Sequence, residues 1–235
     1  MRKQDKNIWH NSWAVESYSI KVNSQDLKSR FDVRRVDGIL DNSEKVRPFE
    51  SAPVVFKQGG IQQTATFKWG MIPFSKASGS VTRRTLEIPA ESLIEKRFNI
   101  SFRVFQQRRC VCLIDKFTVR MFPNSDELVT VTSNPGEPFA VAGVWDCWSN
   151  AMSVYTREPE NFRTFAMLTV PFPPEAGMEF THLRMPFVLS RDAATEWLNS
   201  RLDPYGLVRE IFNQRADDAP EMTIKVSQSP GSELN

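Results

Sequence analysis

Apolar and polar residues follow one another along this chain in patterns that predict many strands and fewer helices. Two apolar runs, residues 53–57 and 61–69, flank Gln58-Gly59-Gly60. Glycine supplies the positive φ that a tight turn needs, so this stretch predicts a β-hairpin. Further strand-like runs cover residues 110–122, 127–132, 139–144, 162–170 and 222–226.

Helical spacing is rarer and comes in short pieces. It occurs at residues 24–31, 90–96 and 98–107. Ser190 is placed to cap a helix over residues 191–200, and Asp203-Pro204 is typical of the start of another helix. Residues 33–53 are polar and interrupted by Gly38, Asn42 and Pro48, which predicts a long loop.

These elements predict an α+β fold. No linker, repeat or composition break divides the 235 residues, which suffice for one large core. We expect a single domain with an extensive, mostly antiparallel, barrel-like β-sheet flanked by short helices. Residues 1–7 are expected to be a polar extension, residues 8–226 the domain and residues 227–235 a flexible tail.

Composition limits the location of the protein. No apolar run approaches the roughly 20 residues of a membrane span, and the N-terminus leads into no apolar signal segment, so we expect no membrane association and a cytoplasmic monomer. Three cysteines, an odd number, argue against a disulfide framework. Cys110 and Cys112 would share one face of a strand and are interpreted as core residues. We expect neither a metal nor another cofactor.

Charge is concentrated in one segment. The net charge of +2 is too small to indicate nucleic acid by itself. Residues 83–109, however, hold seven basic and three acidic side chains. Such a surface could follow a phosphate backbone, and a solvated helix face with Glu–Lys and Glu–Arg pairs is about as plausible.

The stretch Thr181-His182-Leu183-Arg184-Met185-Pro186 carries the most suggestive chemistry. It places one of only two histidines two residues before an arginine. A general acid or base beside an anion-binding guanidinium suits a phosphate-bearing ligand. Alternatively, both side chains are simply solvated at a loop-to-strand junction.

Six stretches, in order, resemble the SRAP family, the SOS response-associated peptidases. They are residues 69–73 (WGMIP), 90–92 (AES), 108–110 (RRC), 139–145 (FAVAGVW), 165–169 (FAMLT) and 182–186 (HLRMP). The resemblance runs from about Ile8 to Leu198 and implies the fold of that family. Its members form covalent crosslinks with abasic sites in single-stranded DNA.

The resemblance also implies which groups the chemistry needs. Active members begin, after loss of the initiator methionine, with a cysteine whose amine attacks the sugar aldehyde and whose thiol closes a thiazolidine ring. Here Arg2 follows Met1, and Ile8 falls where that cysteine would lie. The nucleophile is therefore missing from the expected position.

Other family positions are changed as well. The family's Asn-Ala-Arg-x-Glu motif would fall on residues 87–91, which puts Glu87 in place of the amide and Pro89 in place of the phosphate-binding arginine. The catalytic glutamate would fall near Val119, which cannot transfer a proton. Of the catalytic set, only His182 matches.

Three hypotheses follow. The first is a DNA-damage-linked module that binds single-stranded or abasic-site DNA through Trp69, Arg84, Thr169 and Arg184 and has lost the crosslinking and peptidase chemistry. The second is a non-catalytic interaction or regulatory protein that keeps the fold, for example with an active paralogue as its partner. The third is an enzyme that processes abasic sites by an altered route.

Overall fold

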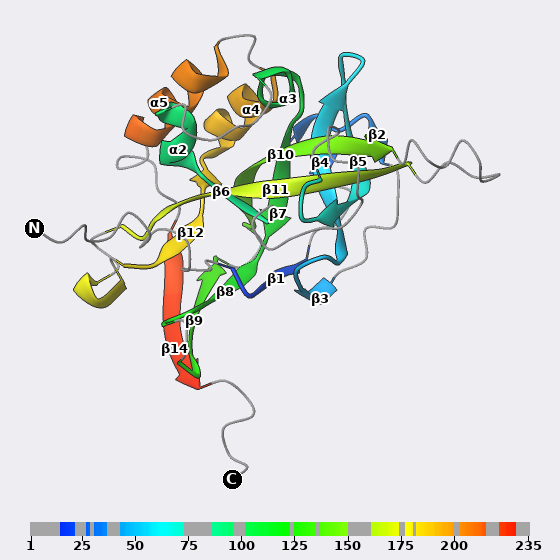
Figure 1. The fold of residues 1–235 in the computed structure, drawn as a ribbon. Coiled ribbons are helices and arrows are strands. Elements are labelled where there is room, and N and C mark those ends of the chain that lie inside the picture. The colour runs from blue at the N-terminus through cyan, green and yellow to red at the C-terminus, as the bar shows by residue number, and fades with distance from the viewer. Residues whose placement is uncertain are drawn as a thin grey trace, which may run out of the picture.

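The described part of the chain forms two β-sheets (Figure 1). In this computed structural model the described residues are 15–21, 27–28, 31–36, 43–72, 86–95, 102–122, 125–134, 137–149, 161–173, 177–180, 182–199, 203–214 and 221–228. The smaller sheet has the order β14-β9-β8-β1-β3. Its strands are β1 (Ser17–Ile20), β3 (Ser43–Val46), β8 (Lys116–Arg120), β9 (Glu127–Ser133) and β14 (Met222–Gln228).

The larger sheet has the order β12-β11-β10-β7-β4-β5-β2, with β6 paired to β11 and β13 paired to β10. Its strands are β2 (Arg35–Val36), β4 (Ser51–Gln58), β5 (Ile61–Trp69), β6 (Glu87–Pro89), β7 (Arg109–Ile114), β10 (Phe139–Ser149), β11 (Asn161–Pro171), β12 (Arg184–Pro186) and β13 (Val188–Leu189).

One additional pairing closes part of the larger sheet into a barrel. β5 pairs with β4 in antiparallel fashion and with β11 in parallel fashion, where Thr164 lies opposite Lys68 and Phe165 opposite Trp69. The sequence of pairings β11-β10-β7-β4-β5 therefore returns to β11. Four of the five junctions are antiparallel, which confirms the predicted α+β fold with a mostly antiparallel, barrel-like sheet.

Aromatic side chains fill the barrel. Phe56 of β4, Phe67 of β5 and Trp145 of β10 are buried and lie with ring centroids 4.9–5.4 Å apart. Because β10 is not adjacent to β4 or β5, these rings meet across the interior. The guanidinium of Arg163 lies 5.3–5.7 Å from all three ring centroids, and it donates to Gln58 Oε1 at 3.1 Å.

Short helices cover one side of the barrel (Figure 1). They are α2 (Ala90–Ile94), α3 (Phe102–Gln107), α4 (Arg191–Asn199) and α5 (Pro204–Gln214), with a 3-10 turn at Met178–Phe180. Trp197 of α4 donates to the carbonyls of Cys110 and Gly143 at 3.0 and 3.3 Å, which fixes α4 against β7 and β10.

Several local predictions are confirmed. Gly59 and Gly60 have φ values of +60° and +81° at the turn between β4 and β5. Ser190 Oγ accepts the N–H of Ala193, and Asp203 Oδ2 accepts the N–H of Gly206, so both predicted caps start their helices. In each case the signal is local, because the turn or cap uses residues within four positions.

Three predictions need correction. Residues 33–53 are not one loop, because they contain β2, β3 and the start of β4. β2 and β3 are edge strands of their sheets and carry more polar residues than the central strands. Residues 110–122 are two strands, β7 and β8, which break at Asp115. There the Asp115 N–H donates to Ser19 O and its carbonyl accepts the Ser133 N–H, so the chain turns from one sheet to the other. β14 extends to Gln228, two residues into the expected tail.

Cys110 and Cys112 are buried, as predicted. Burial raises the pKa of the Cys110 thiol well above its usual value, so that thiol stays protonated at neutral pH. Within the described ranges, no group of three or more His, Cys, Asp or Glu side chains is arranged to hold a metal ion. None of the described helices is long and apolar enough to cross a membrane.

Close packing between β10 and β7 predicts that a methyl group added at Gly143 destabilises the fold. In Gly143→Ala the new Cβ would lie 3.0 Å from Cys110 Sγ and 3.1 Å from the Ala166 carbonyl oxygen. We expect the free energy of unfolding in urea to fall by about 1–3 kcal/mol. Gly206→Ala is the matched control: its nearest contact, Asp203 Oδ2 at 3.6 Å, is ordinary, and the helix should gain roughly 0.5–1 kcal/mol. Equal effects at the two sites would contradict the packing argument.

The carboxyl group of Asp115, at the corner between β7 and β8, predicts that the stability of the fold depends on pH. Burial raises the pKa of its carboxyl, so the folded protein binds that proton more tightly than the unfolded chain does. The stabilisation that comes from this tighter proton binding is present at low pH, and it is lost as the pH rises through the pKa of Asp115 in the folded protein. Asp115→Asn should therefore raise the Tm at pH 7, and the gain should shrink below about pH 4. Asp126→Asn, at the exposed end of the hairpin, should change the Tm little at either pH. A gain that grows on acidification would contradict this assignment.

Candidate functional site

The candidate site lies where the C-terminal half of β11 is flanked on both sides. β6 runs parallel to β11, with Thr169 opposite Pro89. β12 runs antiparallel on the other side, with Thr169 opposite Pro186 and Pro171 opposite Arg184. The register therefore brings together residues 87–89 and 184–186, which the sequence places almost 100 positions apart.

Arg184 and Thr169 meet, as expected, but the arginine is also held by an acid. Arg184 Nε donates to Thr169 Oγ1 at 3.1 Å, and its Nη2 donates to the Thr169 carbonyl at 2.8 Å. The same Nη2 donates to Glu91 Oε2 at 2.7 Å, at a largely buried position. Glu91 reaches Arg184 because α2 begins directly after β6. The guanidinium charge is therefore largely compensated within the protein.

Glu87 holds the start of the described chain. Its Oε1 accepts the backbone N–H of Val15 at 2.7 Å. The next residue, Glu16, donates its N–H to the Thr118 carbonyl, and its carboxylate accepts Arg120 Nε at 3.2 Å. Val15 and Glu16 thus link β6 to β8. The carboxylate that replaces the family's amide serves here as an acceptor for the backbone.

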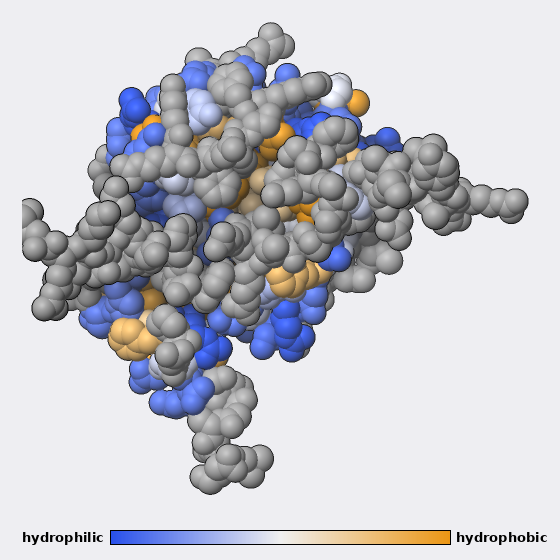
Figure 2. All heavy atoms as spheres, viewed as in Figure 1, coloured by the Kyte–Doolittle hydropathy of each residue, from blue (hydrophilic) through white to orange (hydrophobic). Residues whose placement is uncertain are grey.

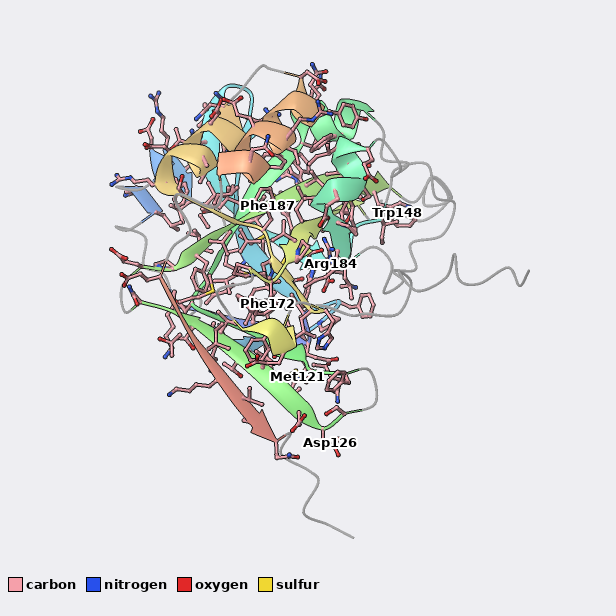
Figure 3. All side chains as sticks on the ribbon, turned by 90° about the vertical axis from the view of Figure 1, so that its left-hand side faces the viewer. Met121, Asp126, Trp148, Phe172, Arg184 and Phe187 are labelled. Carbon is pink, nitrogen blue, oxygen red and sulfur yellow. The ribbon has the colours of Figure 1, made fainter. Side chains whose placement is uncertain are left out.

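His182 lies in an exposed turn before β12 and contacts the end of β8. Its Nε2 lies 2.8 Å from the Met121 carbonyl oxygen. A carbonyl only accepts, so Nε2 donates in this hydrogen bond, which leaves Nδ1 outside it. The ring also stacks on Phe122, with centroids 4.9 Å apart and planes 5° apart. In Figure 3, Arg184, Phe172 and Met121 follow one another down the face turned toward the viewer.

Val119 lies in β8, two residues before Met121. Its side chain is 1% exposed and belongs to the hydrophobic core. An apolar, buried side chain neither accepts nor donates a proton. The position that the resemblance assigns to a catalytic carboxylate is therefore part of the packing between the strands.

Trp69 does not have the position that base stacking would require. Its side chain is 0% exposed, its Nε1 donates to the Leu86 carbonyl at 3.1 Å, and its ring packs edge-on against Tyr18. A base needs an accessible ring face, so this placement argues against the expected contact. Two further predicted site positions, Ile8 and Arg84, lie outside the described residues.

Two arginines of the basic segment, Arg108 and Arg109, make contacts within the fold. Arg108 forms an ion pair with the buried carboxylate of Asp146 and lies over the Trp145 ring. Arg109 is buried against Trp197, and burial lowers its pKa to about 10. Neither one extends the basic surface that the composition suggested.

Two contributors were not predicted from the sequence. Glu91 was noted as part of a motif, but its ion pair with Arg184 depends on the strand register. Phe122 ends a strand-like run, and nothing in its local sequence marks it as exposed, although its side chain is 52% exposed. Both acquire their role from a contact with the segment around residues 182–184.

The chain is similar in sequence to a family of known proteins. Residues 17–229 match the family model described as SOS response associated peptidase (SRAP). "Abasic site processing protein YobE" of Bacillus subtilis (strain 168) is 26% identical over 199 residues, which cover 82% of this chain and 86% of that protein. "Abasic site processing protein YoqW" of Bacillus phage SPbeta is 25% identical over 199 residues, 82% of this chain and 84% of that protein.

Solved structures share the fold. A crystal structure from Bacteroides thetaiotaomicron superposes with a TM-score of 0.66 at 20% identity, covering 94% of this chain and 95% of that chain. A second, from Bordetella bronchiseptica, gives a TM-score of 0.64 at 17% identity and covers 91% and 99% of the two chains. At these identities the likeness concerns the fold alone.

Proposed function

Because the chain belongs to the SOS response associated peptidase (SRAP) family, whose model matches residues 17–229, we propose that it binds single-stranded DNA containing an abasic site and does not crosslink to it. The family description and the names of the relatives associate the chain with DNA damage. The relatives match over 82% of its length, which includes β6, β11 and β12. This supports DNA as the ligand of the candidate site.

Valine in place of a carboxylate at position 119 supports the second part of the proposal, that the protein does not crosslink to DNA. Opening the sugar of an abasic site and condensing it with an amine both require proton transfer. The side chain of Val119 is 1% exposed within the core and offers no such group. Glu87, the other altered position nearby, has one carboxylate oxygen on the Val15 N–H.

His182 keeps a binding function under this proposal. With Nε2 on the Met121 carbonyl, its Nδ1 accepts a hydrogen bond from a sugar hydroxyl or from a hydrated aldehyde. A single such bond orients a ligand and contributes about 1 kcal/mol. Peptidase chemistry is not supported by the cysteines of β7, because Cys110 and Cys112 are buried.

A second candidate function is supported by the state of Arg184. Its guanidinium is bonded to Glu91 and Thr169, so a phosphate would have to compete with a carboxylate. A non-catalytic interaction protein that keeps the fold without binding DNA would tolerate this arrangement. The two candidates differ in whether the protein binds single-stranded DNA at all.

The proposed loss of crosslinking predicts a clean denaturing gel. The protein is incubated with an oligonucleotide carrying one abasic site, and separately with the intact oligonucleotide. We expect neither lane to contain a shifted band, because the family's carboxylate position is Val119. Fluorescence anisotropy with the same abasic oligonucleotide should meanwhile report binding with a Kd of roughly 1–100 μM at physiological salt. A stable band in the abasic lane alone would indicate an enzyme with an altered route.

Neutralising Glu91 should strengthen DNA binding. Glu91→Gln keeps an oxygen for Arg184 Nη2 but removes the carboxylate charge, so the arginine becomes available to a phosphate. We expect several-fold tighter binding at 50 mM salt and a plot of log K against log salt that is steeper by at most about 0.7.

Glu50→Gln is the matched control, because it removes the same charge from an exposed pair with Arg47 between β3 and β4. Tighter binding for both variants by the same factor would mean that net charge, and not this site, governs affinity. No binding by the wild-type protein or by Glu91→Gln would favour the interaction protein.

A further inference from the structure

The rings of Phe122 and His182 form a pair at the edge of the candidate site. Their planes are nearly parallel, at 5°, and their centroids are 4.9 Å apart. This is an offset stack, the preferred geometry for two planar rings. Since each ring uses only one face in the pair, the geometry leaves the outer face of the stack for a further planar group.

Exposure distinguishes Phe122 from the other aromatic residues that the structure describes. Three large apolar side chains of the described residues are substantially exposed: Ile61 at 47%, Val226 at 50% and Phe122 at 52%. Phe122 is the aromatic one. His182 is also exposed. In Figure 2, apolar spheres occur as scattered patches among hydrophilic ones on the visible described surface. An exposed ring pair is therefore unusual within the described ranges.

The backbone holds Phe122 in place. The Ser125 N–H donates to the Phe122 carbonyl at 3.0 Å, which closes a turn, and the Met121 N–H donates to the Glu127 carbonyl at 2.9 Å. Arg120 Nη1 donates to the Ser125 carbonyl at 2.7 Å. These hydrogen bonds fix the backbone on both sides of Phe122. A ligand that stacks on the ring therefore does not have to order this part of the chain first.

The partner ring is anchored as well. The bond from His182 Nε2 to the Met121 carbonyl fixes the imidazole beside the residue that precedes Phe122. One hydrogen bond and one stack hold the two rings, which come from positions 60 residues apart. The pair is preorganised from both sides.

We propose that Phe122 and His182 form a stacking platform for an unpaired nucleobase beside the abasic site. This inference rests on the proposed function and names the contact that supplies sequence-independent affinity. Every base has a planar π face, so aromatic platforms bind single strands with little sequence preference. An abasic nucleotide itself has no base to stack, so the platform receives a neighbouring base of the strand.

The surroundings favour stacking over phosphate contact at this point. Arg120 is bonded to Glu16, and Asp126 lies beyond Met121 toward the end of the hairpin (Figure 3). These charges do not favour a phosphate. Stacking releases no counterions, so its contribution should not vary with salt, in contrast to phosphate contacts.

The test measures binding of an oligonucleotide with 2-aminopurine next to a tetrahydrofuran abasic analogue. We expect Phe122→Ala to bind about tenfold more weakly at both 50 and 200 mM salt. Quenching of the 2-aminopurine fluorescence on binding should be lost in the same variant. Phe122→Trp should retain both signals, whereas Phe122→Leu, which is bulky but has no π face, should behave like the alanine variant.

Val226→Ala is the matched control, since it truncates an equally exposed apolar side chain on β14; it should bind like the wild type. Equal binding by the wild type, Phe122→Ala and Phe122→Leu would overturn the platform and leave DNA binding intact. Absence of wild-type binding would overturn the proposed function together with the platform. Because Phe122 is exposed, thermal melts of its variants should match the wild type, which separates binding from folding.

Discussion

The parallel pairing of β5 with β11 is the constraint on which the rest of the structure depends. It closes five strands around Phe56, Phe67 and Trp145, and it fixes the register of β11 from one end. The other end of the same strand then pairs with β6 and β12. A shift of one residue in β11 would turn Thr169 away from Arg184, because side chains alternate between the two faces of a strand. The barrel and the candidate site therefore share one register.

The candidate site divides into two parts of different chemistry. In the upper part, Arg184, Glu91 and Thr169 form a compact network in which a cation is matched by a carboxylate. In the lower part, His182 and Phe122 present planar rings at the end of β8. Val119, two residues before Met121, belongs to the core. These groups offer stacking and single hydrogen bonds more than net charge, which is what the proposed binding without crosslinking requires.

Local signals in the sequence were reliable where neighbouring residues decide the structure. The hairpin at Gly59 and Gly60 and the helix starts at Ser190 and Asp203 involve contacts over a few residues. The prediction failed at residues 33–53, where the edge strands β2 and β3 carry more polar residues than the central strands. It also failed at Asp115, since a corner between two sheets depends on carbonyls and amides from Ser19 and Ser133. Nothing near Asp115 in the sequence identifies those partners.

For the candidate site, the sequence by itself determined which chemical groups are present. It placed valine at position 119, glutamate at 87 and histidine at 182, and it matched the family in order along the chain. Only the tertiary structure decided what those groups contact. Arg184 binds Glu91 across 93 positions and His182 binds Met121 across 61, while Trp69 is enclosed by the core. Such contacts depend on strand register and on how the sheets pack, and both arise from the whole chain, whereas a residue's chemistry belongs to the residue alone.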